Sequence, residues 1–405
     1  GEIYNYRTLR SDLERRQVKF VTNSDTEVIL NSYISSGPDC LNRFNGMFAF
    51  AIWDDVERTL FAARDRLGIK PFFYSHSERY LIVASNTKSI RAVRNNQISI
   101  DPSGLDSFLA YRYVVGPGTL YKEISQLSPG HYLSYSDGTI RIQRYWRAPV
   151  PSANTETPID EKEQCSIIRS KIGDAVEKRL VSDVPVTAFL SGGLDSSILV
   201  TEMVKRYSGT VRTFTIGVDD YDPGGESIHA RSVSEYCDTE HFDMKLSPQA
   251  YIDLISPLIA LRDGPLGVAN EVLIYAMSKA LREHGKVVLS GEGADELFGG
   301  YGRIFRSGLD WTRMQAIANK QIGKNGLEQE LRQNLLQKYG TTNSPSVVDH
   351  FLAQYAYTPA AVRATLLHPD VWSEGRAEKV SKTLFNTAFT EVDGIEAQSK
   401  FLWIF

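Results

Sequence analysis

Residues 184–197 read Val-Pro-Val-Thr-Ala-Phe-Leu-Ser-Gly-Gly-Leu-Asp-Ser-Ser, and this stretch decides the fold of the second half of the chain. Its run 186–190 is short, apolar and followed by turn residues, which is typical of a buried parallel strand. A strand, a glycine turn and a helix N-terminus leave N–H groups and a positive dipole end facing the turn. The pattern predicts a phosphate site, although a plain strand-to-helix connection is the alternative. The phosphate-facing residues are predicted to be Ser191, Gly192, Gly193, Asp195, Ser196 and Ser197.

The turn lacks the lysine of the common Gly-x-x-x-x-Gly-Lys-Ser/Thr nucleotide loop and carries a carboxylate, Asp195, instead. Two like charges about 4 Å apart repel by roughly 4 kcal/mol at an effective dielectric constant near 20. A divalent cation between carboxylate and phosphate removes this repulsion, and Mg²⁺ commonly bridges one or two carboxylates to phosphate oxygens. The turn therefore predicts bound Mg²⁺.

A second acidic turn follows another predicted buried strand, residues 286–290. It reads Gly-Glu-Gly-Ala-Asp-Glu-Leu-Phe-Gly-Gly-Tyr over residues 291–301. In an open α/β sheet, ligands bind beyond the carboxyl ends of the strands. Asp195 and Asp295 are therefore predicted to hold the same Mg²⁺, one from each turn. The alternative for the second turn is a helix start with acidic first-turn residues.

These two turns together resemble the ATP-pyrophosphatase domain of the glutamine-hydrolysing asparagine synthetase family. Residues 1–147 resemble the glutaminase domain of the same family, and the matching motifs occur in the family's order. They are Gly-Glu-Ile-Tyr-Asn-Tyr at 1–6, Ser-Asp-Thr-Glu-Val-Ile-Leu at 24–30, Asn-Gly-Met-Phe-Ala-Phe-Ala-Ile-Trp-Asp at 45–54 and Arg-Asp-Arg-Leu-Gly-Ile-Lys-Pro at 64–71. Residues 302–405 match only loosely.

The chain is predicted to form two domains joined by a linker. Residues 1–147 contain short β-type runs between turns and a helix over 24–34, which predicts an α+β arrangement of antiparallel sheets with helical cover. The resemblance implies the N-terminal-nucleophile glutaminase fold for this domain. Residues 148–163 are rich in proline and hydroxyl side chains and predict the linker. Over 164–405 strands and helices alternate, which predicts a doubly wound parallel sheet. The strands are predicted over 186–190, 211–218, 241–245 and 286–290, and the helices over 195–207, 226–237, 248–262 and 271–284.

The resemblance also implies roles in the second domain. Leu190 and Ile216 would read the adenine of ATP through nearby backbone groups, and Ser290 and Gly291 would contact the nucleotide. Glu292 would be catalytic, because the matching glutamate accepts a proton as ammonia attacks an acyl-adenylate or stabilises the resulting intermediate. A helix-start glutamate is the alternative for Glu292.

In the first domain, the resemblance implies that Gly1, Glu2 and Asp25 bind glutamine, with Asp25 facing its α-ammonium group. The alternative for Asp25 is a helix N-cap. The family's nucleophile is an N-terminal cysteine, whereas residue 1 is glycine and Cys40 is predicted to pack in the core. We therefore expect no glutamine hydrolysis from the chain as written, and we expect a chain cut short at both ends.

The charged run Arg-Asp-Arg at 64–66 lies among apolar strand residues. Solvated edge charges or a structural ion pair are the favoured explanations for it, ahead of a catalytic role.

Composition excludes several classes of protein. The formal net charge of −4 over 405 residues gives no basic surface for nucleic acid. The longest apolar run is about seven residues, against the roughly 20 needed to span a bilayer. Three scattered cysteines, Cys40, Cys165 and Cys237, indicate neither a disulfide framework nor a zinc site and fit the cytoplasm.

The leading hypothesis is a ligase that makes asparagine from aspartate, glutamine-derived ammonia and ATP, through an acyl-adenylate, releasing AMP and pyrophosphate. One alternative keeps this machinery and amidates another carboxylate, such as a sugar acid or one closed into a lactam. A second alternative is a non-catalytic protein on the same fold. ATP and Mg²⁺ are the expected cofactors, small molecules the expected partners, and a homodimer is left open.

Overall fold

The structure is a computed structural model of the whole chain. It describes residues 1–95, 97–150, 160–219, 225–318, 345–369 and 377–392, together with residues 329, 330, 333 and 400. The chain forms two compact units. The larger unit contains residues 1–101, 116–148 and 160–290, and the helical unit contains residues 102–115, 149–159 and 291–405.

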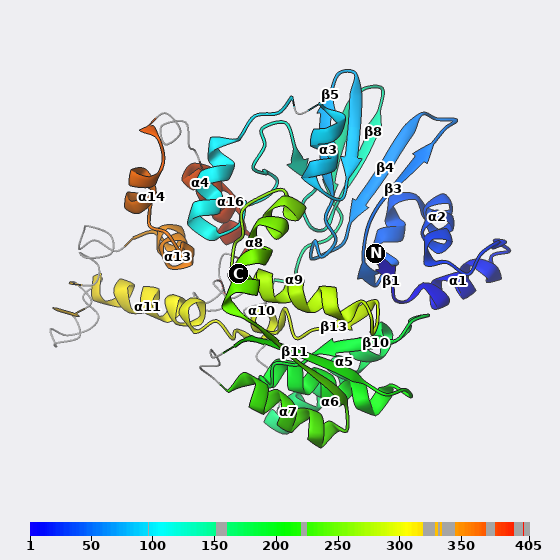
Figure 1. Cartoon of the computed structure of the whole chain (residues 1–405). Coiled ribbons are helices and arrows are strands. Elements are labelled where there is room, and N and C mark those ends of the chain that lie inside the picture. Colours follow the sequence, from blue (N-terminus) through cyan, green and yellow to red (C-terminus); the bar gives the residue numbers. More distant parts are fainter. Residues whose placement is uncertain are drawn as a thin grey trace. The chain divides into compact units, whose positions relative to one another are not determined.

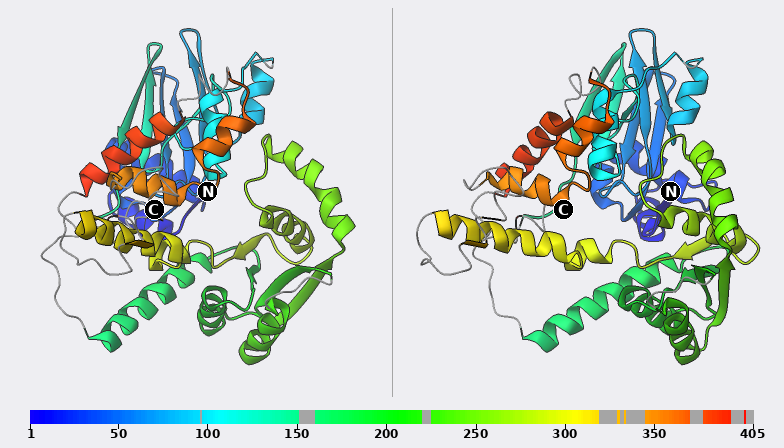
Figure 2. Two further views of the ribbon diagram at one scale, coloured as in Figure 1. Left: turned by 90° about the vertical axis from the view of Figure 1, so that its left-hand side faces the viewer. Right: turned by 60° about the vertical axis from the view of Figure 1, so that its left-hand side comes forward.

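The first part of the larger unit is built on antiparallel strands. The four-stranded sheet has the order β3-β4-β8-β9, the three-stranded sheet has the order β6-β5-β7, and β1 pairs with β2. Their bounds are β1 Glu2–Ile3, β2 Gly46–Met47, β3 Ala49–Asp54, β4 Thr59–Arg64, β5 Phe73–Ser77, β6 Tyr80–Ala84, β7 Ser125–Gln126, β8 His131–Ser136 and β9 Thr139–Arg144. The strands of the two sheets run side by side in both views of Figure 2.

Strand β4 explains how these layers stack, because it is apolar on both faces. Phe61 and Ala63 face the core under α1 (Tyr6–Arg15) and α2 (Asp25–Ser36). Ala62 points the other way, into a core that includes residues of the second sheet. A third core lies between that sheet and α3 (Thr87–Val93). The layers therefore follow the order helix, sheet, sheet, helix, with the short 3₁₀ helix η1 (Gly37–Arg43) beside α2.

The second part of the larger unit is a parallel sheet with helices on both faces. Its strands are β10 (Val186–Phe189), β11 (Arg212–Val218), β12 (Glu240–Leu246) and β13 (Val287–Leu289). In Figure 1, α6 and α7 lie below this sheet and α9 lies above it. The helices are α5 Glu161–Arg179, α6 Leu194–Arg206, α7 Glu226–Cys237, α8 Pro248–Arg262 and α9 Asn270–Leu281. The predicted parallel sheet is confirmed, and the predicted helices 226–237 and 248–262 match the observed bounds.

Strand order locates the ligand-binding edge of the parallel sheet. The order is β12-β11-β10-β13, so the chain builds outward from β10 to β12 and then returns to pair β13 with the free side of β10. The crevice where strand order reverses in this way is where open α/β sheets bind ligands. Here it lies between the carboxyl ends of β10 and β13, which are the strands that precede the two acidic turns.

The helical unit packs a helix from the middle of the chain with helices from its end. Its described helices are α4 Pro102–Tyr111, α10 Ala294–Phe298, α11 Gly302–Ala318, α13 Val347–Tyr355, α14 Ala360–Leu366 and α16 Ala377–Glu391. Phe351 is fully buried at its centre, together with Tyr111 of α4 and Phe389 of α16. Asp106 of α4 forms a buried ion pair with Arg363 of α14, with 2.6 Å between Oδ1 and Nε.

Some predicted features lie outside the described residues. Most of the predicted linker, residues 151–159, and the apolar end of the chain, residues 401–405, belong to this group. Among the residues that the structure does describe, no helix combines the length and apolar character needed to cross a membrane.

Candidate functional site

The turn between β10 and α6 has a backbone that only glycine fits. Gly192 has φ +78°, and a Cβ atom there would lie 2.4 Å from the backbone nitrogen of Ala230 in α7. Gly193 is the N-cap of α6 and has extended backbone, with no side chain to cap the helix. The first N–H groups of an α-helix have no partner within the helix. The turn therefore leaves them for a ligand, as the sequence predicts for a phosphate site.

The hydroxyl groups of this turn hold it in shape. The Oγ atoms of Ser191 and Ser196 are 3.1 Å apart, and Ser196 is buried. The Ser197 hydroxyl donates a 2.6 Å hydrogen bond to the carbonyl of Gly193. Asp195 stands exposed in the first turn of α6. Serine hydroxyls therefore shape the turn, while the Asp195 carboxylate points to solvent where a cation could bind.

The backbone beside the turn suits recognition of a flat base. The N–H of Leu190 donates to the Phe214 carbonyl at 2.9 Å, and Thr215 donates its hydroxyl to the Leu190 carbonyl. Backbone groups alternate in direction along a strand, so Ile216 directs its own to the same side as Phe214. On that side β10 has already ended. Ile216 thus offers backbone groups beyond the end of β10, whereas those of Leu190 are engaged within the sheet.

The second acidic turn begins beside the first. Leu289 pairs with Ala188 in parallel register, so Ser290 leaves the sheet next to the Ser191 turn. From Gly291 onward the chain belongs to the helical unit. The pairing brings Ser191 and Ser290 to the same edge of the sheet, while a Mg²⁺ shared by Asp195 and Asp295 stays a prediction.

Two glycines, Gly293 and Gly300, shape the second acidic turn within the helical unit. Gly293 has φ +93° at the N-cap of α10, and the carboxylate of Asp295 lies against Gly300, where a Cβ atom would overlap it. The Tyr301 hydroxyl donates to Glu296 at 3.1 Å. Desolvation, followed by that bond and neighbouring carboxylates, raises the pKa of Tyr301 to about 12. Glu292 is exposed on this turn.

The donor set of these turns fits Mg²⁺. No group of three or more His, Cys, Asp and Glu side chains gathers around a metal position among the described residues. A magnesium site of the predicted kind needs only one or two carboxylates, since phosphate oxygens and water complete the shell. Exposed Asp195, beside the free N–H groups of α6, meets that requirement.

The residues predicted to bind glutamine come together at β1. Glu2 pairs with Met47, and Gly1 fits tightly, because a Cβ atom there would lie 2.5 Å from the Met47 carbonyl oxygen. The Asp25 carboxylate accepts a 2.9 Å hydrogen bond from the N–H of Ile3. Partial desolvation, and then the charge of Asp25, raise the pKa of Glu2. Two carboxylates thus lie near β1, close enough for the charge of one to act on the other, which suits a positively charged ligand group.

The alternative for Asp25 as a helix N-cap is wrong. Ser24 is the N-cap of α2, and its Oγ accepts from the N–H of Thr26 at 3.1 Å. Asp25 is the first helical residue, which turns its side chain away from the cap and toward β1.

Arg64 and Asp65 are buried and structural rather than solvated, and no ion pair formed by either is found among the described residues. Half-buried Arg66 donates to the carbonyl groups of Phe44 and Asn42. The Arg64 guanidinium donates to carbonyl groups of Gly68, Lys70 and Leu127. Buried Asp65 accepts four N–H bonds, from Phe48, Leu67, Ile69 and Lys70. Sequence reasoning missed this network, although Gly68, three residues after Asp65 and with φ +67°, marks the tight turn that the carboxylate holds.

Cys40 packs in the core, as predicted. It is 1% exposed, and burial raises the pKa of its thiol to about 12. A thiol with such a pKa carries almost no thiolate at neutral pH, so Cys40 has no nucleophilic character.

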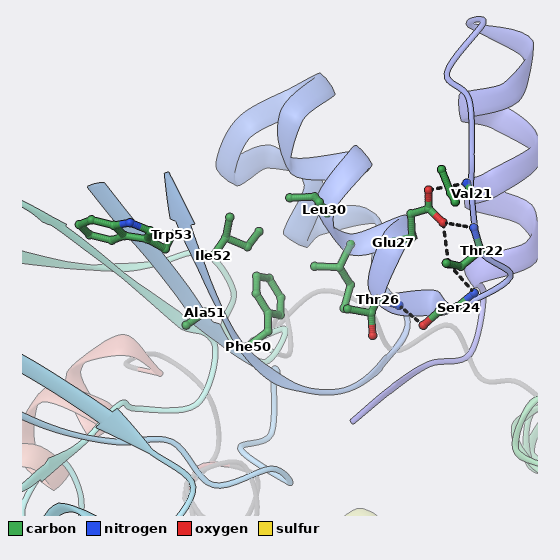
Figure 3. Close-up of a pocket in the computed structure, with 11 residues that line it drawn as sticks. Val21, Thr22, Ser24, Thr26, Glu27, Leu30, Phe50, Ala51, Ile52 and Trp53 are labelled. Atoms are coloured by element: carbon green, nitrogen blue, oxygen red, sulfur yellow. Dashed lines mark hydrogen bonds between the residues drawn. The ribbon is translucent and has the colours of Figure 1, made fainter. Parts of the chain in front are cut away.

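An apolar hollow of about 660 Å³ lies between α2 and β3 (Figure 3). Its walls include Leu30, Phe50, Ile52 and Trp53, and its acidic residue is Glu27. Both carboxylate oxygens of Glu27 are engaged, accepting from the backbone of Val21 and Thr22 and from the Thr22 hydroxyl. The hollow therefore offers apolar surface and no convergent polar groups for chemistry.

The chain matches two protein-family models. Residues 1–146 match a glutamine amidotransferase domain, and residues 168–393 match asparagine synthase. It is 36% identical over 318 residues to an asparagine synthetase [glutamine-hydrolyzing] 1 of Bacillus subtilis, a match covering 78% of this chain and 49% of that protein. It is 36% identical over 306 residues to a putative asparagine synthetase of Methanocaldococcus jannaschii, covering 74% and 58%.

A relative with a different name is also similar. The chain is 30% identical over 342 residues to amidase chry2 of Gibberella zeae, a match covering 79% of this chain and 50% of that protein. The chain thus spans about half the length of the curated relatives it matches. With the asparagine synthase model covering more than half of its residues behind a glutamine amidotransferase domain, this chain belongs to the asparagine synthase family.

Proposed function

We propose that the protein is an ATP-dependent amido-ligase that converts aspartate to asparagine with ammonia taken from glutamine. The observation that carries the proposal is the pairing of β10 with β13 at the point where strand order reverses. Because of this pairing, the predicted phosphate turn after β10 and the start of the acidic turn after β13 lie at the same edge of the sheet. Asparagine synthetase relatives at 36% identity support aspartate as the acceptor.

The proposed reaction has two steps. An oxygen of the acceptor carboxylate attacks the α-phosphorus of ATP, and the bond from that phosphorus to the β-phosphate oxygen breaks, which releases pyrophosphate. Ammonia then attacks the acyl carbon and loses a proton, and AMP leaves as the amide forms. Mg²⁺ would neutralise the phosphates, held by Asp195 and Asp295.

Each predicted residue has a task in this scheme. The turn Ser191–Ser197 binds the β- and γ-phosphates through the first N–H groups of α6, which cost no reorganisation during the reaction. Ile216, with Leu190, Ser290 and Gly291, holds the nucleoside. Glu292 accepts the proton lost by ammonia. Gly1, Glu2 and Asp25 bind glutamine in the amidotransferase domain.

We further propose the domain boundaries 1–147 and 164–405 with the linker 148–163. We assign the N-terminal-nucleophile glutaminase class to the first domain. The sequence of layers around β4 supports this class, and helices on both faces of the parallel sheet support a doubly wound second domain.

The test is pyrophosphate release by the protein as encoded in its gene, with ATP, Mg²⁺, ammonium and one carboxylic acid at a time. We expect release that depends on aspartate and a matching amount of asparagine. An Asp195→Asn variant is the control that should lose it. If no acid that is tried supports pyrophosphate release, the ligase proposal is contradicted. Release at the same rate with and without an acid would also contradict it.

A second acceptor is the main alternative within the same chemistry. The 30% identity to a fungal protein named amidase chry2 favours testing carboxylic acids other than aspartate. Release with another acid, and not with aspartate, would keep the ligase and change its substrate.

A further inference from the structure

Asp263, the residue that ends α8, is bound by side chains from the first third of the chain. Its carboxylate accepts from the Thr87 hydroxyl at 2.9 Å and forms an ion pair with Arg91, both on α3. Its carbonyl accepts from the Tyr121 hydroxyl at 3.3 Å. The Asp263 side chain is only 10% exposed. We call Thr87, Lys88, Arg91, Tyr121 and Asp263 the Asp263 junction.

The junction is closed by contacts among its own members. Arg91 lies over the Tyr121 ring, 5.0 Å from its centroid, and donates to its hydroxyl at 3.0 Å. Lys88 donates to the Ala260 carbonyl at 3.2 Å, one turn before Asp263. The end of α8 lies beneath α3 in Figure 1 and in the right-hand view of Figure 2. The contacts that Thr87, Lys88, Arg91 and Tyr121 make with Ala260 and Asp263 join the segment matched as amidotransferase to the segment matched as asparagine synthase, within the larger unit. The contacts between Arg91 and Tyr121 lie within the first of these segments.

The backbone at Asp263 shows that the position is specialised. Asp263 has φ +60°, a left-handed conformation that costs most side chains energy and that aspartate tolerates better than most. The turn that follows is held at its far end by Glu271, which accepts from the N–H groups of Gly267 and Val268. The turn 263–269 is therefore fixed at both ends, once by the amidotransferase segment and once by α9.

Helix α9 follows this turn and packs against the strands that end at the predicted nucleotide site. Met277 and Leu281 of α9 form a core with Phe214, against which Phe189 and Ile216 pack. Phe189 is the last residue of β10, and Ile216 is the predicted adenine contact. Helix α9 thus connects the turn to the core behind the strand ends that would hold ATP.

We propose that Thr87 and Arg91 are positioning residues that act through Asp263. They keep the glutamine-acting segment docked on the turn 263–269, so that ammonia formed in one segment is used by the other. This inference rests on the proposed function. It predicts that loosening the junction wastes ammonia and leaves the ligase chemistry intact.

The experiment compares three variants of the protein as encoded: Arg91→Met, Asp263→Asn and the control Arg94→Met. Arg94 ends the same helix but bonds to Ser75 and Tyr80, both in the amidotransferase segment. The measured quantity is glutamate formed per pyrophosphate released. We expect this ratio to rise about fivefold or more in both junction variants, as a coupling free energy of typical size implies. Pyrophosphate release with ammonium should stay at the parent rate, and Arg94→Met should change neither quantity.

An unchanged ratio in both junction variants overturns the inference. Failure of the proposed function looks different, since the parent protein would then release no pyrophosphate with ammonium. Hydrogen exchange tests whether the junction holds the turn 263–269 even if the proposed function fails. The amides of residues 264–270 should exchange about tenfold faster in Arg91→Met than in the parent or in Arg94→Met, because local opening follows the loss of the contacts that hold the turn. Equal exchange in all three proteins also overturns it.

Discussion

Ala188 of β10 and Leu289 of β13 are direct partners in a parallel ladder. In the same pair of strands, the Thr187 hydroxyl donates to the carbonyl of Val287, 100 positions along the chain. This pairing makes the edge after Leu190 and Ser290 the reversal point of the sheet. Gly192 and Glu292 lie on the two turns that follow these strands.

Gly192→Ala should destabilise the turn and weaken ATP binding. The left-handed backbone costs about 1–3 kcal/mol for a residue with a side chain. The new Cβ atom would also meet the start of α7. Urea unfolding measures the stability, and the rise in Tm with ATP and Mg²⁺ measures binding. Gly302→Ala is the control, because no atom from another part of the chain lies within 4 Å of the Cβ position there and the backbone is helical. An alanine at 192 that keeps the full ATP-dependent rise in Tm would contradict this role.

Glu292→Gln should separate the two chemical steps. Removing a proton acceptor typically costs about 10²–10⁴-fold in rate, and here only amide formation needs it. Acid-dependent pyrophosphate release in the first turnover should persist while amide formation is lost, as measured by rapid quench in the protein as encoded. Glu296→Gln is the control, since that carboxylate is engaged by Tyr301. Equal loss of both steps would refute the assigned role.

Arg363→Met should destabilise the helical unit strongly. It leaves Asp106 buried without a counter-charge, a change that costs about 3–5 kcal/mol. Denaturant unfolding followed by circular dichroism provides the measurement. Adding Asp106→Asn should recover part of the loss, because the stranded charge is then removed. Arg313→Met is the surface control, where an exposed pair with Asp310 at 3.7 Å is worth about 1 kcal/mol or less. A loss no larger than that of the control would show that the buried pair is dispensable.

His241 should make the parallel sheet sensitive to acid. Burial lowers the pKa of its imidazole below 6.5, against a smaller opposing effect of Asp243. As the pH falls below 6.5, the unfolded chain takes up this proton before the folded one does, so the free energy of unfolding decreases. His241→Asn should flatten that part of the pH profile, measured by urea unfolding between pH 7.5 and pH 5.5, values chosen about one unit either side of an ordinary histidine pKa. Exposed His229→Asn should keep the parent slope. Identical slopes in all three proteins would assign the acid sensitivity elsewhere.

Local sequence predicted most elements of the larger unit. Apolar runs ending in glycine turns located β10 and β13, and the alternation of strands with helices located α7 and α8, because these patterns depend on neighbours in the chain. The two carboxylates beside β1 were also predicted from motifs. What failed was the environment of single side chains. Asp25 follows the cap residue and its carboxylate accepts from the backbone of β1. Asp65 is buried and accepts from the N–H of Phe48, between β2 and β3, and from three N–H groups of the turn that follows β4. No local pattern encodes either arrangement.

The sequence by itself determined which functional groups and local elements are present. They are a hydroxyl- and glycine-rich turn with one carboxylate, a second acidic turn, and the strand that precedes each turn. Only the tertiary structure decided that β13 returns to the side of β10, that α4 packs with helices from the end of the chain, and that α3 holds Asp263. Each of these depends on contacts between residues far apart in sequence. Such contacts form because buried apolar faces and buried charges need partners, and which partner they find is set by packing of the whole chain.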